Sequence, residues 1–125
     1  MDKDFRIEQI VELLSQTLAS EDGSSDEETL VLLRKQIDRL DVTILHLLNN
    51  RSKCANKIGD LKKRLGMPVY VPERESQVLK NVQSENPGPL QDDAIRRLFE
   101  RIIDETRSLE RRLFQEKADR TSGKK

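Results

Sequence analysis

Two cationic residues, Arg51 and Lys62, fall on what should be the apolar face of a long helix. Apolar residues recur around them at helical spacing, namely Leu33, Ile37, Leu40, Ile44, Leu47, Leu48, Ala55, Ile58 and Leu65. At about 100° per residue, Arg51 points along the centre of this stripe and Lys62 lies roughly 20° from it. A charge on a buried face is costly unless an opposite charge pairs with it. Two cations with nearly the same bearing, about 16 Å apart along the axis, therefore predict a pocket for an anion.

Three further polar residues stand in apolar positions of two later helices. Glu75 shares a face with the apolar residues three, four and seven positions further on, Thr106 lies within an apolar stripe, and Glu110 lies at its border. Each alone has an ordinary explanation, such as a salt bridge, a hydroxyl bonded to the backbone, or a solvated edge. Together with Arg51 and Lys62, they favour one polar pocket inside a helical bundle.

Arg34 has a different bearing on the long helix. It lies roughly 100° from Arg51 around the axis and about 25 Å away along it, so one helix cannot easily aim both side chains at one ligand. In an antiparallel dimer, Arg34 of one subunit could approach Arg51 of the other. That geometry would give two equivalent sites, each completed across the interface.

The long helix that must position these residues is predicted over residues 26–65. Ser25 and Glu28 have capping-box spacing at its start, and Gly66 supplies the C-terminal stop. Such a helix measures roughly 55–60 Å, whereas a compact domain of about 100 residues has a radius of gyration of about 13 Å. Because its apolar stripe extends beyond the reach of one chain, we expect a homodimer in which the long helices pack together.

Two more helices follow the long one. Pro72 suits the first turn of a helix over residues 72–84, the Asn-Pro-Gly-Pro segment at 86–89 is a break, and a third helix covers residues 91–115. No segment alternates as a strand does. The predicted fold class is therefore all-α, a three-helix subunit with one very long first helix.

Composition divides the chain into three parts. Residues 1–25 hold a short amphipathic helix, predicted over 4–18, and an acidic linker. Residues 26–115 form the helical domain. Residues 116–125 are polar, and we expect a disordered tail there.

Charge and composition exclude several classes of protein. Lys and Arg balance Asp and Glu at 23 each, so the chain has no general attraction for nucleic acid or an anionic membrane. No run approaches the roughly 18 apolar residues of a membrane span, and the N-terminus lacks the basic start and apolar block of a signal peptide. The single cysteine, Cys54, excludes an internal disulfide and fits a reducing compartment. We expect a soluble, cytoplasmic protein.

Five separated segments carry a family likeness. They are Leu33–Asp41, Leu47–Arg51, Ile58–Lys62, Pro68–Glu75 and Leu98–Glu110. In order and spacing they resemble an all-helical chorismate mutase over about residues 30–112. The Pro-Glu-Arg-Glu and Asn-Pro-Gly-Pro-Leu segments look most like the mutase domain of bifunctional chorismate mutase/prephenate dehydratases. The resemblance implies an intertwined homodimer that converts chorismate to prephenate on the way to phenylalanine and tyrosine.

The resemblance also implies roles for the cations. Arg34 of the partner subunit and Arg51 match the arginines that grip the two carboxylates of the substrate, which suits the planar fork of arginine. Lys62 matches the lysine at the ether oxygen.

The remaining site residues follow in the same way. Glu75 matches the carboxylate that accepts the substrate hydroxyl, with Arg74 beside it. Thr106 stands where the family often has a small hydroxyl residue, and Glu110 replaces a residue that is Gln in some members and Glu in others. Val71 is a departure, because many members have Asp there as another hydroxyl contact.

The implied reaction is an intramolecular pericyclic rearrangement, so it needs no nucleophile, metal or cofactor. The site must hold the compact substrate conformer and stabilise negative charge on the ether oxygen as the C–O bond breaks. Lys62 can stabilise the charge on the ether oxygen. Glu110 can contribute only when it is protonated, since a carboxylate would repel that oxygen. A low dielectric would raise the pKa of Glu110 and the nearby cations would lower it. We predict that activity falls as pH rises through that pKa.

Two alternatives to this function stay open. Isochorismate pyruvate lyase chemistry uses much the same pocket. A non-catalytic helical dimer that senses a ligand or binds a partner gains weight from Val71 and from the extra N-terminal helix. That helix could also dock another enzyme of the shikimate pathway. Because no dehydratase segment follows the third helix, we expect a free-standing mutase or an excised domain.

Overall fold

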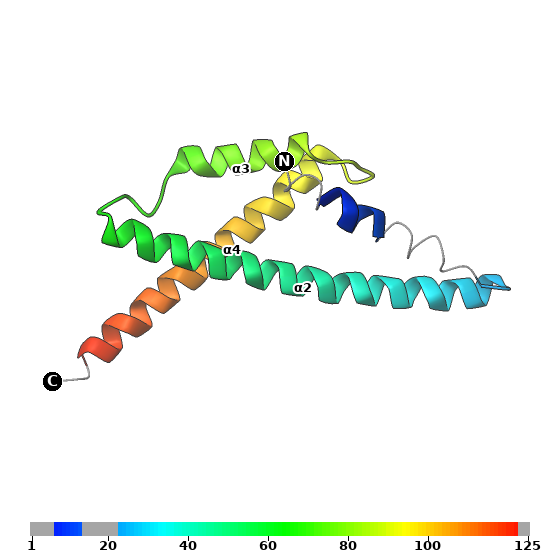
Figure 1. The fold of residues 1–125 in the computed structure, drawn as a ribbon, viewed down its shortest axis with the longest axis horizontal. Helices are drawn as coiled ribbons and strands as arrows, with labels where there is room; N and C mark the ends of the chain where they lie inside the picture. The colour runs from blue at the N-terminus through cyan, green and yellow to red at the C-terminus, as the bar shows by residue number, and fades with distance from the viewer. Residues whose placement is uncertain (1–6, 14–22, 123–125) are drawn as a thin grey trace. The chain divides into compact units, whose positions relative to one another are not determined.

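The computed structural model describes residues 7–13 and 23–122, and these parts contain helices and no strand. A short helix over residues 7–13 precedes α2 (Asp26–Arg64), α3 (Pro72–Ser84) and α4 (Asp92–Ser122) (Figure 1). The all-α fold class is confirmed. Of the N-terminal helix predicted over 4–18, residues 7–13 are helical, and the rest lies outside the described residues. The chain forms two compact units, Met1–Leu47 and Leu48–Lys125, and α2 contributes to both.

The start of α2 is fixed by the predicted cap, with one difference. The backbone N–H of Glu28 donates to Oγ of Ser25 at 3.2 Å, as a capping box requires. The carboxylate of Glu28 accepts from the backbone N–H of Ser24 at 3.0 Å, one residue earlier than expected, and also from the Ser24 hydroxyl. These hydrogen bonds from Ser24 lower the pKa of Glu28 below its ordinary value. The acidic first turn also suits the positive end of the helix dipole.

The end of α2 is a turn that reverses the chain. Gly66 has a φ of 68°, which side chains with a Cβ rarely adopt. The N–H of Met67 donates to the carbonyl of Lys62 at 2.8 Å, and the N–H of Gly66 donates to that of Lys63 at 3.2 Å. This pair of bonds is a Schellman motif, and it sends residues 67–71 back beside the last turn of the helix.

The break between α3 and α4 is organised by one asparagine. Asn86 donates from Nδ2 to the carbonyl of Leu90 at 2.7 Å and to Oδ1 of Asp92 at 2.9 Å, and its Oδ1 accepts from the N–H of Gly88 at 3.1 Å. This local network ties the loop to the first residue of α4. The helices on either side then pack against each other (Figure 1). Leu79 of α3 is buried, at 8% exposed.

The C-terminal part of α4 corrects the sequence prediction. α4 continues to Ser122, so residues 116–122 are helical instead of the expected disordered tail. Gln115 donates to Asp119 at 3.1 Å, an i,i+4 contact, and Lys117 reaches Asp60 of α2 at 3.5 Å. Contacts of this kind between exposed polar residues extend a helix without an apolar face, and composition alone does not reveal them.

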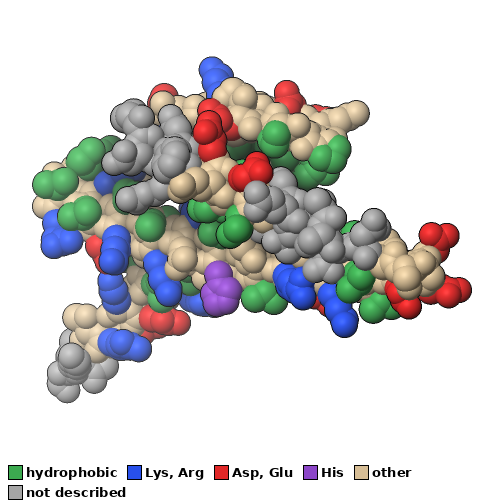
Figure 2. Space-filling view, turned by 45° about the vertical axis from the view of Figure 1, so that its right-hand side comes forward, with side chains coloured by type: hydrophobic (Ala, Val, Ile, Leu, Met, Phe, Trp, Pro, Cys, Tyr) green, Lys and Arg blue, Asp and Glu red, His purple; other side chains and the backbone are tan. Residues whose placement is uncertain are grey.

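Little apolar surface is buried within the chain. Among the described residues, Leu79 is the only hydrophobic side chain classed as buried, and Figure 2 shows hydrophobic side chains at the surface. On α2, Ile44 is 51% exposed, Leu47 62% and Ile58 52%. Most of the apolar stripe predicted to form a packed face is therefore exposed, while Leu40, Leu48 and Ala55 are half-buried. None of the described helices is long and apolar enough to cross a membrane.

Candidate active site

One cavity of about 130 Å³ collects most of the predicted site residues. Its walls are Lys62, Val69, Tyr70, Val71, Arg74, Glu75, Ile103, Arg107 and Glu110, all in the Leu48–Lys125 unit. We call it the Lys62 cavity. Four predicted residues from three separate segments of the sequence thus line one cavity, namely Lys62, Arg74, Glu75 and Glu110. Of the five residues predicted to share one polar pocket, Lys62, Glu75 and Glu110 line this cavity, whereas Arg51 and Thr106 do not.

Lys62 reaches the cavity because of the turn that ends α2. It lies in the last turn of the helix and is half-buried. Its Nζ donates to the carbonyl of Val69 at 3.4 Å, in the segment that the Gly66 turn sends back. A lysine at this position places a positive charge at the C-terminal end of the helix, where the dipole favours it.

Glu75 and Arg107 form an ion pair on the cavity wall. Glu75 comes from the first turn of α3, and its Oε1 contacts Nη2 of Arg107 from α4. The Arg107 guanidinium also lies over the Tyr70 ring, 4.5 Å from its centroid. Arg107 was not among the site residues predicted from the sequence. Its spacing, four residues after Ile103 and three before Glu110 on the same helix face, was the available signal.

The surroundings of Glu110 alter the pKa of its carboxyl. Burial raises the pKa of its carboxyl above the ordinary value, while Lys62, Lys63 and Arg107 oppose the shift through their positive charges. The expected conflict between desolvation and nearby cations is therefore present, and desolvation prevails.

Arg51 and Thr106 form a second group, outside the Lys62 cavity. Arg51 donates from Nη1 to Oγ1 of Thr106 at 3.3 Å, and Thr106 donates in turn to the carbonyl of Ile102 at 2.9 Å. Thr106 is buried at 8% exposed. The inward positions predicted for both residues are correct, and the hydroxyl also makes the ordinary backbone bond within its helix.

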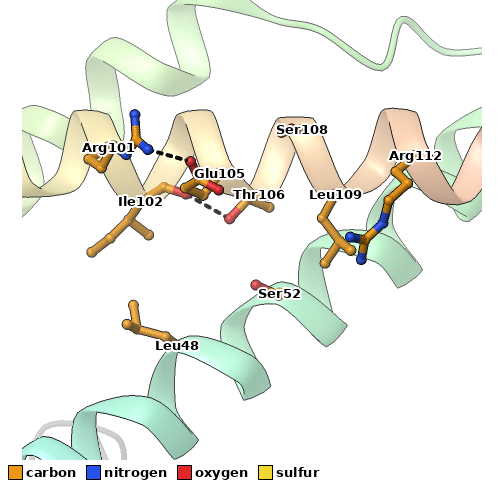
Figure 3. A pocket seen from close by; sticks show the side chains of 9 residues that line it. All are labelled: Leu48, Ser52, Arg101, Ile102, Glu105, Thr106, Ser108, Leu109 and Arg112. Carbon is orange, nitrogen blue, oxygen red and sulfur yellow. Dashed lines mark hydrogen bonds and ion pairs between the residues drawn. The ribbon is translucent and has the colours of Figure 1, made fainter.

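A larger cavity of about 420 Å³ lies between α2 and α4 beside Thr106. Figure 3 shows Leu48 and Ser52 of α2 facing Ile102 and Leu109 of α4 across it. Thr106 is the only predicted site residue in its lining. The cavity with the larger volume is therefore not the one that contains most of the predicted site residues.

Arg34 lies on the exposed surface of α2 in the Met1–Leu47 unit. Every other predicted site residue lies in the Leu48–Lys125 unit. Its predicted role across a dimer interface stays a prediction.

The chemistry available in the Lys62 cavity is that of an anion site with both donors and acceptors. The cations of Lys62 and Arg74 attract negative charge, the carboxylate of Glu75 accepts a hydrogen bond, and a protonated Glu110 donates one. Such a wall can hold a small anion and stabilise an oxygen that becomes negative during a reaction.

Comparison with known proteins identifies the family of this chain. The chorismate mutase type II family matches residues 33–111, a span that includes every predicted site residue. The chain is 44% identical over 87 residues to a bifunctional chorismate mutase/prephenate dehydratase of Neisseria gonorrhoeae, covering 70% of this chain and 24% of that protein. The chain thus spans about a quarter of the length of this relative, and 25% of a similarly named protein of Aquifex aeolicus.

Two shorter relatives match over nearly their whole length. A chorismate mutase of Methanocaldococcus jannaschii is 29% identical over 90 residues, covering 71% of this chain and 91% of that protein. The solved structure of a chorismate mutase from Thermus thermophilus superposes with a TM-score of 0.64 at 42% identity, covering 66% of this chain and 94% of that one. The helical fold and the sequence therefore point to the same family.

Proposed function

The chain belongs to the chorismate mutase type II family, and from this premise we propose that it converts chorismate to prephenate in phenylalanine and tyrosine biosynthesis. One observation carries the proposal: Lys62, Glu75 and Glu110 line a single cavity, within the span that the family matches. The reaction breaks the ether C–O bond and forms a C–C bond within one molecule, so the site needs to bind, orient and stabilise charge.

Lys62 and Glu110 stabilise the ether oxygen in this mechanism. Lys62 donates to the oxygen as it gains negative charge, and removing such a donor costs about 3–4 kcal/mol in other enzymes. Protonated Glu110 supplies a second donor, and its raised pKa keeps more of the carboxyl in that form. Both groups act most strongly in the transition state, where the charge on the oxygen is greatest.

Glu75 and the arginines hold the substrate in place. Glu75 accepts a hydrogen bond from the hydroxyl of chorismate, and Arg74 lines the same cavity. Arg51 binds one substrate carboxylate, and its bond to Thr106 restricts where the guanidinium points. Arg34 from a second subunit binds the other carboxylate.

The active form is a homodimer in this proposal. Exposed apolar residues along α2 support it, because a stripe with Leu33, Ile37, Ile44 and Leu47 all more than a third exposed needs a partner. The α2 helix of a second copy would cover this stripe and bring its Arg34 to the site.

The single cysteine, Cys54, fits the reducing cytoplasm.

The test is to mix the purified chain with chorismate, follow its disappearance in the ultraviolet and identify the product. We expect catalytic formation of prephenate. In a parallel assay with isochorismate, release of pyruvate by a chain that leaves chorismate untouched would establish the lyase instead. Tight binding of chorismate by a folded protein without turnover would establish a binding module and refute the enzyme.

A further inference from the structure

The ion pair between Arg107 and Glu75 joins two helices at the wall of the Lys62 cavity. Arg107 comes from α4 and Glu75 from α3, and their side chains are 34% and 28% exposed. Partial burial removes some of the water that weakens ion pairs at a free surface. The contact therefore constrains both side chains more than the exposed i,i+4 pairs along α4 do.

A third side chain fixes the plane of the arginine. Tyr70, from the segment before α3, lies under the guanidinium with 4.5 Å to the ring centroid. Arginine can stack on an aromatic face and donate hydrogen bonds from its edge at the same time. The Tyr70 ring therefore fixes the plane of the guanidinium, and Glu75 fixes its orientation within that plane. The segment before α3, α3 and α4 thus meet at one cation, while α2 contributes Lys62 to the same cavity.

This arrangement leaves Glu75 able to bind a ligand. The pair engages Oε1, and a carboxylate has a second oxygen that can accept a hydrogen bond. Val71 lines the same cavity and offers no polar side-chain atom. The family resemblance implies an Asp at this position in many members. The hydroxyl of the substrate then depends on Glu75, whose free side chain would otherwise sample several rotamers.

We propose that Arg107 is a positioning residue that holds Glu75 in the orientation that accepts the substrate hydroxyl. The inference rests on the proposed function, and it adds a residue that the sequence analysis did not assign. Fixing Glu75 before the substrate arrives lowers the ordering cost of binding. Arg107 acts on hydroxyl binding through Glu75, so its effect on KM disappears when Glu75 can no longer be positioned as a carboxylate, whereas its charge acts on the pKa of Glu110 separately.

The experiment is a double-mutant cycle with steady-state kinetics on chorismate. We expect Arg107→Gln to raise KM about fivefold and to change kcat by less than about twofold, because the hydroxyl contact exists in both ground and transition states. In a Glu75→Gln background, the same change should alter KM by less than about twofold. Arg107→Lys, which keeps a charge, should recover part of the loss. Arg97→Gln, an exposed residue paired with Asp93, is the matched control and should match wild type.

Three results overturn the inference. The first is an unchanged KM in Arg107→Gln, and the second is the same fivefold rise in the Glu75→Gln background. If Arg107→Gln fails to fold by circular dichroism, Arg107→Met takes its place in the cycle, and the third result is a wild-type KM in that variant. Turnover by the wild-type chain with any of these refutes the positioning role alone, whereas no turnover by wild type refutes the proposed function and this inference with it.

Discussion

Arg51 donates a hydrogen bond from Nη1 to Oγ1 of Thr106 across 3.3 Å, and the bond joins α2 to α4. The Thr106 proton goes to the carbonyl of Ile102 at 2.9 Å, so the hydroxyl oxygen is left to accept from the arginine. The same hydroxyl therefore makes the backbone bond common for threonine in helices and also orients a cation. A buried polar residue in an apolar stripe here bonds to its own helix and also contacts a cation on another helix.

Replacing Thr106 with Val tests that bond, since Val keeps the shape and removes the hydroxyl. We expect the free energy of unfolding to fall by about 1–2 kcal/mol, because the half-buried Arg51 loses its acceptor. We also expect kcat/KM for chorismate to fall about tenfold through loss of orientation. Thr106→Ser restores the hydroxyl and should return both values toward wild type. Urea unfolding and turnover measure the two effects, and wild-type values for Thr106→Val would show that the hydroxyl orients nothing.

The pH profile of the enzyme should report the protonation of Glu110. Burial raises the pKa of its carboxyl against the opposing charges of Lys62, Lys63 and Arg107. The carboxyl can donate only below that pKa, so kcat/KM should fall as pH rises through it. Glu110→Gln donates at every pH and should flatten the profile between about pH 5 and pH 8. A wild-type rate that is constant over this range would contradict the assignment.

The same shift has a consequence for stability. Because the folded state raises the pKa of Glu110, the contribution of its proton is fully present below the ordinary value of 4.5 and is lost as pH rises through the folded pKa. The melting temperature of Glu110→Gln should therefore depend less on pH in this window than that of wild type. This comparison is the control for the kinetic profile, because it needs no substrate.

Mixing two inactive variants tests whether the site is shared between subunits. Arg34→Ala and Lys62→Ala should each be nearly inactive as homodimers. If Arg34 serves the Lys62 cavity of its partner, each mixed dimer has one intact site and one with both changes. Random exchange after refolding together should then restore about a quarter of wild-type activity. No recovery, with mixed dimers shown by mass spectrometry, would place both residues in the site of one subunit.

Two glycines of the same region should respond in opposite ways to alanine. Gly66 has a φ of 68°, so Gly66→Ala should lower the free energy of unfolding by about 1 kcal/mol. Gly59 lies inside α2, and a Cβ there would meet nothing within 4 Å, so Gly59→Ala should raise it by about 0.5–1 kcal/mol. Urea unfolding of the two variants compares them directly, and destabilisation by Gly59→Ala would show that the helix is packed differently there.

Helix positions were the most predictable part of the fold. The bounds of α3, Pro72–Ser84, agree with the prediction because a proline opens it and the Asn-Pro-Gly-Pro segment follows it. The long helix likewise begins at its cap and ends before Gly66. The predicted end of α4 was wrong, because its last turns carry polar side-chain contacts, such as that of Lys117 with Asp60, which hydrophobic periodicity does not register.

The site was predictable only as far as single helices allow. Periodicity gave the inward bearing of Glu75 and Thr106, which depends on one helix at a time. It could not tell which residues would meet across helices, so it missed that Arg51 contacts Thr106 and that Arg107 pairs with Glu75. Those contacts depend on the angles at which α4 crosses α2 and α3. The positions of residues around a single helix do not determine these angles.

The most direct measurement of the central claim is the turnover of chorismate by Lys62→Ala beside Lys57→Ala, an exposed lysine on the same helix. If the Lys62 cavity stabilises the breaking ether bond, kcat for Lys62→Ala should fall about 100- to 1000-fold, while Lys57→Ala keeps the wild-type rate and both remain folded dimers. Prephenate formed by Lys62→Ala at close to the wild-type rate would contradict the account, because the rearrangement would then occur elsewhere.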